Sequence, residues 1–383
     1  RTPIGKFGSA LKDVSAVELG RTAAAASLER IGLTPEDIDE GIVGHARQAG
    51  NGPNLARQIG FRLGVPVDRP GYSINKACAS GLKAITLACQ SILTGENDIV
   101  LAGGVEQMSQ IPYLLMKARW GYRLGGDELV DAMHRDGYYC PMAEMMMGRT
   151  AENLVEEYGI GREEQDEFAL DSHQKAVRAW EEGLFDAEVV PVEAPARRGQ
   201  TMLVEKDERP RPSTTMEKLA RLSPVFKEDG TVTAGNASGI TDGGAATVVM
   251  AAERAEAMGI EPLARIEAFA SAGVHPRRMG MGPVPATRKV LEQTGLSLDD
   301  LDVIELNEAF AAQVLAVEHE LDWDVERRNV HGGAIALGHP TGCTGTRIVV
   351  TLLHAMRERD AEIGLATLCV SGGLGMAMVV RRV

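Results

Sequence analysis

The sequence predicts an α/β protein built from two similar halves. The segments Leu28–Asp39 and Leu291–Asp302 match at six of twelve positions, and each reads as the end of a helix, a loop and the start of a strand. In the same way, Asp98–Gly104 resembles Gly364–Gly373, because both are apolar strands that run into a pair of glycines. Repeated helix–strand patterns of this kind favour a duplicated α/β unit.

The first half also contains an insertion. A chain of 383 residues is too long for one ordinary hydrophobic core. Between 111 and 235 the apolar pattern breaks into short pieces punctuated by prolines, with helices expected only at 152–158 and 162–182. We therefore expect an N-terminal half at 1–255, which includes a loop domain at 111–235, and a C-terminal half at 256–383.

Hydrophobic spacing predicts the remaining elements. Apolar residues three and four positions apart indicate helices, and short apolar runs bounded by turn residues indicate strands. On this basis we expect helices at 18–31, at 58–63 and from Cys78 to about Gly95, and strands beginning at Ile42 and spanning 98–104, 247–251, 303–306 and 365–368.

Composition and charge exclude several classes of function. The formal charge is −14, so general binding to nucleic acid or to an anionic membrane is not expected. No apolar run reaches the roughly 18–20 residues that a membrane span needs, and the first residues do not resemble a signal peptide. The five cysteines are widely spaced and contain no CxxC pair, which argues against a disulfide framework or a zinc site. A reducing, cytoplasmic location fits better.

Cys78 is the first candidate for chemistry. It lies in Ser73–Gly81, where an extended segment after the turn Arg69–Gly71 leads into a helix. The start of a helix has unpaired N–H groups and the positive end of the dipole, and both favour a thiolate. Small neighbours leave room for a substrate. The alternative is a small buried apolar residue, which is the more common role of a single cysteine.

Three further candidates lie in the second half. Asn307 follows an apolar strand, where polar side chains often face a ligand, although it could instead cap a helix. His339 lies in a stiff glycine- and proline-rich loop and is suited to act as a base for a thiol; that loop lacks the lysine of a phosphate-binding P-loop. Cys369 lies at the end of the strand 365–368, before a glycine-rich turn that should give it access and free backbone donors, and it could equally be inert.

A basic cluster lies within the insertion. In an acidic chain it is a candidate site for a phosphate-bearing ligand, and a solvated surface is an equally good interpretation of the same residues. The cluster consists of Arg197, Arg198, Lys206, Arg209, Arg211, Lys218, Arg221 and Lys227.

Taken together, these features resemble the thiolase family over essentially the whole chain. The motifs that carry the resemblance occur in the family's order: Arg1–Lys6, Asn75–Gly81, Thr150–Asn153, Gly235–Gly239, Asn307–Phe310, Gly332–Pro340 and Cys369. The resemblance implies two α/β halves stacked in five αβαβα layers, with a loop domain inserted in the first half.

The resemblance also implies roles for the candidates. Cys78 matches the acylated nucleophile, and His339 matches the histidine that takes its proton and lends its ring to an oxyanion hole. Cys369 matches the second cysteine, which moves the α-proton of acetyl-CoA. Asn307 matches the residue that holds a water in that first oxyanion hole. The main-chain N–H groups of Cys78 and Ser371 match the other hole. No metal and no cofactor is implied; coenzyme A and acyl-CoA are substrates.

For coenzyme A, the resemblance places Arg211 near the nucleotide and Ser238 near the pantetheine. It makes Leu222, Phe226 and Phe310 an apolar wall, to which the run Met145–Met147, and Met147 in particular, can add an adaptable surface. Two positions depart from the family. Ser371 stands where glycine is common, and Met146 stands where short-chain biosynthetic members commonly carry histidine, which leaves the length of the acyl chain open.

The expected function is therefore acetyl-CoA C-acetyltransferase activity: condensation of two acetyl-CoA to acetoacetyl-CoA, or thiolytic cleavage of a 3-ketoacyl-CoA. Alternatives are a longer-chain 3-ketoacyl-CoA thiolase of fatty-acid metabolism, a decarboxylating ketoacyl synthase, which Cys369 argues against, and a non-catalytic acyl-CoA carrier. The resemblance also implies a homodimer or a homotetramer.

Overall fold

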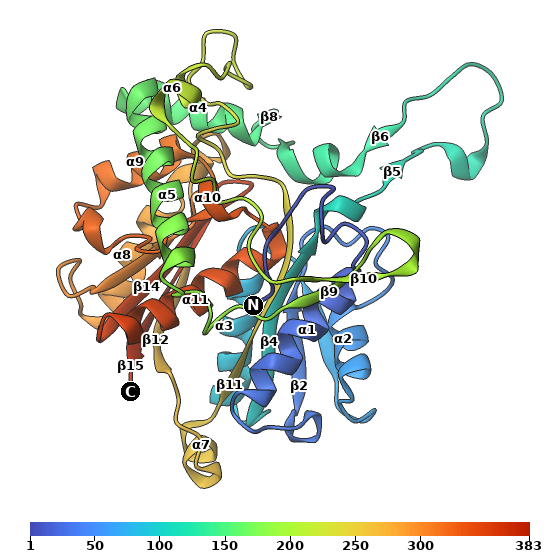
Figure 1. Ribbon diagram of the computed structural model, residues 1–383, viewed down its shortest axis with the longest axis vertical. Coiled ribbons are helices and arrows are strands. Elements are labelled where there is room, and N and C mark those ends of the chain that lie inside the picture. Colours follow the sequence, from blue (N-terminus) through green and yellow to red (C-terminus); the bar gives the residue numbers. More distant parts are fainter.

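The computed structural model describes residues 1–383 and contains two main β-sheets (Figure 1). The first sheet has the order β1-β11-β4-β2-β3 and the second has the order β12-β15-β14-β13. In both, one parallel pair (β2 with β4, β13 with β14) lies beside a long antiparallel strand (β11, β15). The strands are β1 Gly5–Lys6, β2 Glu40–Gly44, β3 Gly71–Ile74, β4 Ile99–Gln107, β11 Thr241–Met250, β12 Ala264–Gly273, β13 Val303–Leu306, β14 Ile363–Val370 and β15 Leu374–Arg382.

Helices and sheets alternate in five layers. α3 (Ser80–Leu93) and α11 (Thr341–Glu358) lie between the two sheets and share one apolar core with β4 and β14. α1 (Ala16–Glu29) and α2 (Leu55–Leu63) cover the outer face of the first sheet. α8 (Pro283–Thr294) and α9 (Ala311–Glu320) cover the outer face of the second. The predicted duplicated α/β fold is confirmed.

The sequence repeat has a structural counterpart. Asp39 Oδ2 accepts hydrogen bonds from the N–H groups of Asp98 and Ile99, at 3.0 and 2.9 Å. Asp302 Oδ2 accepts the equivalent pair at the start of β14, from Glu362 and Ile363, at 2.9 and 2.8 Å. Each repeat therefore ends on a carboxylate that fixes the first residues of the neighbouring parallel strand.

The two central helices meet near their N-terminal ends. A Cβ added at Gly81 would lie 2.7 Å from the backbone nitrogen of Thr346, and one at Gly345 would lie 2.3 Å from that of Leu82. Real Cβ contacts are not this short, so any larger residue would push α3 and α11 apart. The absence of side chains at these two positions lets the segments before both helices come together.

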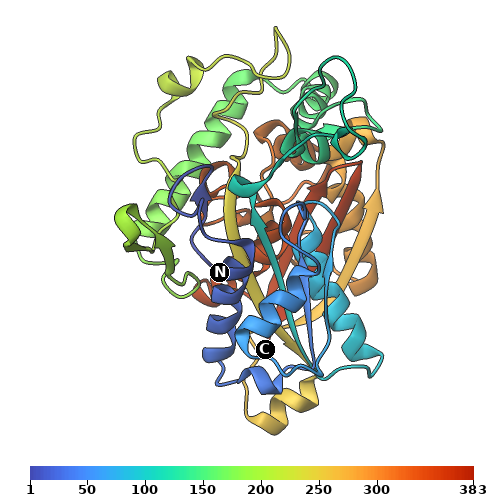
Figure 2. The ribbon, with the colours of Figure 1, turned by 90° about the vertical axis from the view of Figure 1, so that its right-hand side faces the viewer.

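The insertion forms a loop-rich domain with its own short elements. α4 (Met147–Tyr158), α6 (Met216–Ala220) and the β5–β6 excursion lie at the end of the molecule opposite α7 (Ala252–Met258), as both ribbon views show (Figure 2). The other elements are α5 Arg162–Glu181, α10 Ala334–Leu337, β5 Tyr113–Leu114, β6 Val130–Asp131, β7 Tyr139–Cys140, β8 Met145–Met146, β9 Val192–Pro195 and β10 Thr201–Val204. The domain boundary expected between 255 and 256 falls within α7 and stays a prediction.

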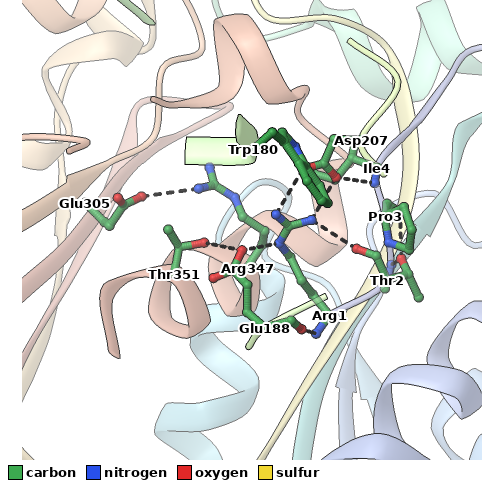
Figure 3. A network of polar contacts seen from close by, with 11 residues as sticks. Arg1, Thr2, Pro3, Ile4, Trp180, Glu188, Asp207, Glu305, Arg347 and Thr351 are labelled. Carbon is green, nitrogen blue, oxygen red and sulfur yellow. Dashed lines mark hydrogen bonds and ion pairs between the residues drawn. The ribbon is translucent and has the colours of Figure 1, made fainter. Parts of the chain in front are cut away.

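A buried polar network ties the first residues to the insertion (Figure 3). Arg1 Nε donates to Glu188 Oε1 at 2.5 Å, and its Nη1 donates to Asp207 Oδ1 at 2.8 Å. The main-chain N–H of Ile4 and the indole N–H of Trp180 also donate to Asp207, at 2.7 and 3.1 Å. A buried carboxylate with several donors is well compensated, so this network holds the insertion against the first sheet.

Several predicted strand limits are wrong. β4 continues through Gly103 and Gly104 to Gln107, and β11 begins at Thr241 rather than 247. The glycines that suggested a turn lie inside β4, where Gly104 faces Gly342 and Gly81 and a side chain would not fit. Cys369 lies within β14 rather than beyond its end. None of the helices is long and apolar enough to span a membrane.

Candidate active site

Cys78 lies in the turn between β3 and α3, as predicted. The hydroxyl of Ser80 accepts from the N–H of Lys76 at 2.8 Å and donates to the carbonyl of Ala77 at 2.7 Å. Asn75 Oδ1 accepts from the N–H of Ala77 at 2.9 Å. Ala77 adopts a φ of 45°, in the left-handed region that non-glycine residues rarely occupy. The turn that carries Cys78 is therefore strained and held by three local hydrogen bonds.

Two main-chain N–H groups lie close enough to the Cys78 sulfur to influence its pKa. Burial raises the pKa of the thiol, and the charge of Arg47 and hydrogen bonds from the N–H groups of Ser371 and of Cys78 itself act in the opposite direction. Positive φ angles in the turn after β14 fall on Gly372 and Gly373, so Ser371 is not in that region. The pair of N–H groups is in position to stabilise negative charge at the reacting atoms.

His339 is held in one orientation. Its Nδ1 lies 2.6 Å from Thr344 Oγ1, and that hydroxyl donates its only proton to the carbonyl of Pro340 at 3.0 Å. This arrangement favours a proton on Nδ1, which leaves the lone pair of Nε2 free. The N–H of His339 also donates to the carbonyl of Gly239 at 3.2 Å. These contacts give the imidazole the tautomer that a general base requires.

The imidazole is kept neutral by its surroundings. Burial lowers the pKa of His339 to about 3, and the charges of Arg347 and Arg47 act in the same direction. Arg347 lies fully buried on α11, with Glu305 Oε2 at 3.2 Å. Burial raises the pKa of Glu305 to about 8, and the charge of Arg347 acts in the opposite direction.

Cys369 is fully buried within β14. Burial raises the pKa of its thiol, and the proximity of Cys78 raises it further. Cys369 is the last residue but one of β14, as expected for a strand end, but its burial contradicts the expected access. Cys369 is a neutral thiol close to Cys78.

Asn307 follows β13, which pairs in parallel with β14. Its N–H donates to the carbonyl of Thr367 at 3.0 Å, which places it two residues from Cys369 on the neighbouring strand. Its side chain is fully buried, and neither Oδ1 nor Nδ2 has a hydrogen-bond partner. It does not cap a helix, since α9 begins at Ala311. Buried amides without partners are rare and suit a group that binds a water or a ligand.

Two buried glutamates, to which the sequence assigned no role, join the segments of the site. Glu106 accepts from the N–H groups of Arg47 and Gly342, at 3.0 and 2.8 Å, and so links β4 to the start of α11. Glu308 accepts from Asn329 Nδ2 and from the N–H of Ile335, at 2.8 and 3.0 Å, next to the loop of His339. Glu106 lies inside β4 and Glu308 lies two residues after β13, so no local pattern in the sequence marks either of them.

The predicted apolar wall forms beside Cys369. Phe310 packs edge-on against Phe226, with ring centroids 6.1 Å apart, and Met147 belongs to the same apolar cluster as Phe310 and Cys369. Ser238 joins this wall because its N–H donates to the carbonyl of Ala309 at 3.0 Å. Met147, Ser238, Phe226 and Phe310 are therefore brought together.

Arg211 and Leu222 lie apart from the reacting groups, on the exposed surface of the insertion. The N–H of Arg211 donates to His173 Nδ1 at 3.3 Å, and its guanidinium has no ion pair. The basic cluster does not form one patch. Lys227 pairs with Glu156 and Lys206 lies over Trp180, whereas Lys218 and Arg221 stay exposed near Arg211. Arg197 and Arg198 are also exposed, on the separate turn between β9 and β10.

Comparison with known proteins agrees with this geometry. Residues 1–253 match the family model of the thiolase N-terminal domain, and residues 260–382 match that of the thiolase C-terminal domain. A Staphylococcus aureus protein (strain MSSA476) named "Probable acetyl-CoA acyltransferase" is 53% identical over 382 residues, which cover 100% of this chain and 97% of that protein.

Solved structures give the same result. The Bacillus anthracis acetyl-CoA acetyltransferase superimposes with a TM-score of 0.97 at 48% identity, covering 100% of this chain and 96% of that one. Human mitochondrial 3-ketoacyl-CoA thiolase gives a TM-score of 0.97 at 42% identity, covering 100% and 97%. The chain belongs to the thiolase family and is an acyltransferase.

Proposed function

We propose that the chain catalyses reversible acyl transfer between Cys78 and coenzyme A, cleaving 3-ketoacyl-CoA or, in reverse, condensing two acetyl-CoA to acetoacetyl-CoA. The observation that carries the proposal is the surroundings of the Cys78 sulfur. Two N–H groups point to it, and a second thiol lies close by. His339 precedes α11, whose N-terminal end meets that of α3, and the lone pair of its Nε2 is free. Because the pKa of Cys78 is raised and that of His339 is lowered, the resting pair is a neutral thiol and a neutral imidazole.

In cleavage, Cys78 Sγ attacks the 3-keto carbon of the substrate while His339 Nε2 takes the thiol proton. The keto oxygen gains negative charge, which the N–H groups of Cys78 and Ser371 stabilise. The bond between C2 and C3 then breaks. The acyl group stays on Cys78, and the leaving fragment is the enolate of acetyl-CoA.

The enolate needs a proton at carbon and donors at oxygen. Cys369, held as a neutral thiol by burial, donates its proton to the carbon and becomes a thiolate. The new N–H at His339 Nε2 and a water on the unpartnered amide of Asn307 stabilise the enolate oxygen. Coenzyme A then gives its thiol proton to Cys369 and attacks the acyl carbon. His339 returns its proton to the Cys78 sulfur as that sulfur leaves.

Coenzyme A and acetyl-CoA are the substrates that the related acyltransferases and thiolases imply. We propose that the phosphates lie near Arg211, beside the exposed Lys218 and Arg221, and that the pantetheine passes Ser238 and Leu222 to reach Cys78. No metal or other cofactor enters these steps. A homodimer or homotetramer in the cytoplasm remains our prediction.

A longer acyl chain is the second candidate substrate. The apolar cluster beside Cys369 contains Met147 and Phe310, with Met145 and Phe226 packed against it. Methionine side chains adapt their shape readily and can make room for different chains. Comparing kcat/KM for thiolysis over 3-ketoacyl-CoA substrates of four to sixteen carbons distinguishes the two candidates.

Mass spectrometry after incubation with acetyl-CoA tests the proposal. We expect one acetyl group on the peptide that contains Cys78, and its loss when free coenzyme A is added. Cys89, which lies on α3 outside the site, serves as the internal control and should stay unmodified. Folded protein without an adduct on Cys78 would contradict the enzymatic function.

A further inference from the structure

Arg47 is a largely buried cation without an ion-pair partner, and it lines a surface cavity together with Asn75 and Asp136. It follows β2, it is only 8% exposed, and no carboxylate lies within ion-pair distance of its guanidinium. Its side chain donates no hydrogen bond, and Nε is buried without any acceptor. A buried guanidinium is usually paired, because desolvation of an isolated charge is expensive. Keeping this one unpaired therefore needs a reason.

The surrounding chain fixes the guanidinium in place. The N–H of Arg47 donates to Glu106 Oε1 at 3.0 Å, and the same carboxylate accepts from the N–H of Gly342 at the start of α11. On the other side lies Gly137, in the single π-helical turn His134–Tyr138. A Cβ at Gly137 would lie 2.6 Å from Arg47 Nε and 2.7 Å from Nη2. The φ angle of Gly137 is not in the positive region, so the glycine provides space rather than an unusual backbone conformation.

Arg47 lies close to the turn of Cys78. Asn75 Nδ2 donates to the carbonyl of Ala46 at 3.0 Å, and Asn75 Oδ1 accepts from the N–H of Ala77 at 2.9 Å, so one side chain joins the residue before Arg47 to the residue before Cys78.

The charge of Arg47 acts on both Cys78 and His339. Among the influences that lower the pKa of the Cys78 thiol, Arg47 is the largest and exceeds the two N–H groups. Arg47 also disfavours the protonated form of His339. Because Glu106 joins the backbone of Arg47 to the start of α11, the cation keeps its place relative to the His339 loop.

We propose that Arg47 is an electrostatic positioning residue for Cys78, and that its unpaired guanidinium, seated against Gly137, stabilises the negative charge that forms on the Cys78 sulfur during proton loss and acyl release. The inference deepens the proposed function and rests on it for the acyl step. Arg47 does not itself contact the reacting atoms.

Other ionisable groups also face this region and would share in any pH dependence. Glu106 opposes the effect of Arg47 by raising the pKa of Cys78. Burial raises the pKa of Tyr138, which also lies close enough to Arg47 and Cys78 to interact with their charges. The remaining groups are His45 beside Glu106, Asp131 near Tyr138, Asp136 in the same π-helical turn, His339 and Cys369.

Alkylation of Cys78 by iodoacetamide as a function of pH tests the proposal without any acyl-CoA. The rate is read from the modified Cys78 peptide by mass spectrometry. We expect Arg47→Met to move the midpoint upward by about one pH unit and to slow alkylation at pH 7 about tenfold. Arg47→Lys keeps the charge and should retain more than half of the wild-type shift.

Gly137→Ala provides a second variant that leaves every charge in place. Its methyl group must displace the guanidinium, so we expect an upward shift smaller than that of Arg47→Met. In steady-state kinetics, both variants should lower kcat and leave KM for acetyl-CoA unchanged.

The proposal would be overturned if the alkylation midpoint of Cys78 stayed at the wild-type value in folded Arg47→Met. If Arg47→Met does not fold, the same result in folded Gly137→Ala would overturn it. Failure of the proposed function is separate, because it appears as absence of the acetyl adduct while the alkylation profile still reports on Arg47.

Discussion

The two halves of the molecule share a framework and differ in the residue that precedes the central helix. In the first half, Cys78 lies ahead of α3 on a turn strained at Ala77. In the second, His339 lies ahead of α11 between Gly338 and Pro340. The helices meet at Gly81 and Gly345, so the duplicated framework brings the two segments together. Duplication thus supplies the geometry, and the different residues before the two helices supply the nucleophile and the base that we propose.

The two cysteines of the site show a second difference. Cys78 is half-buried, and the charge of Arg47 and two N–H groups oppose the effect of burial on the pKa of its thiol. Cys369 is fully buried within a strand, and only its own N–H opposes the effect of burial. The first arrangement allows a negative sulfur to form beside an incoming substrate. The second keeps the thiol protonated until it donates its proton to the carbon of the enolate in the mechanism that we propose.

Alanine substitution of each cysteine should separate these roles. Cys78→Ala removes the acyl acceptor, so we expect both acetylation and thiolysis to fall to background. Cys369→Ala should still allow acetylation of Cys78, more slowly, because coenzyme A can leave as a thiolate without the Cys369 proton, but should slow condensation roughly 10²- to 10⁴-fold, the usual contribution of a general acid or base. Acetyl incorporation and acetoacetyl-CoA formation measure the two steps. If both steps survive in Cys369→Ala, the role given to Cys369 is wrong.

Asn307→Ala tests whether the buried, unpartnered amide serves the enolate oxygen. Removing one donor of an oxyanion hole typically reduces kcat by about 10²- to 10³-fold. Because neither amide atom bonds within the chain, we expect no comparable loss of thermal stability. Asn329→Ala is the matched control. Asn329 donates hydrogen bonds to Glu308 and to the carbonyl of Leu306, so its replacement should destabilise the fold. An equal loss of stability in both variants would make Asn307 structural.

The pH dependence of acetylation tests the neutral pair formed by Cys78 and His339. Since burial lowers the pKa of His339 to about 3, the imidazole stays unprotonated from pH 7 down to about pH 4. We therefore expect no loss of rate from His339 protonation between pH 7 and pH 5. An imidazole with an ordinary pKa of about 6.5 would instead lose most of its basic form, a fall of about thirtyfold at pH 5. Stopped-flow acetylation over this range measures the difference.

Thr344→Val tests how the tautomer of His339 is fixed. Valine keeps the shape of threonine and removes the hydroxyl that receives the Nδ1 proton. With that partner lost, the imidazole can carry its proton on Nε2 and can no longer accept one from Cys78. We expect about a tenfold decrease in the acetylation rate with little change in KM, in line with the modest net strength of a single hydrogen bond. Thr344→Ser, which keeps the hydroxyl, should restore most of the rate.

The sequence predicted the elements that carry Cys78, His339 and Asn307 because local signals mark them: a turn before a helix, a glycine–proline loop and a strand end. It placed Cys369 correctly near the end of its strand but expected it to be accessible, and it ended β4 at Gly104; the accessibility and the strand limit were wrong. Gly104 packs against Gly342 and Gly81, which are distant in the sequence and leave no room for a side chain. Glu106, Glu308 and Thr344 escaped prediction because their function depends on partners brought together by folding.

Ser371→Gly should have the smallest effect. The sequence departs from the family's common glycine here, yet only the main-chain N–H of Ser371 acts on Cys78, and the positive φ angles of the turn fall on Gly372 and Gly373. Glycine keeps that N–H, so we expect kcat to change less than about threefold, with a slight loss of stability from added backbone freedom. Ser371→Pro removes the N–H and should reduce kcat about a hundredfold or more. A large loss of kcat in Ser371→Gly would mean that the hydroxyl of Ser371 itself contributes. The residues that supply the two N–H groups near Cys78 would then not act through those N–H groups alone.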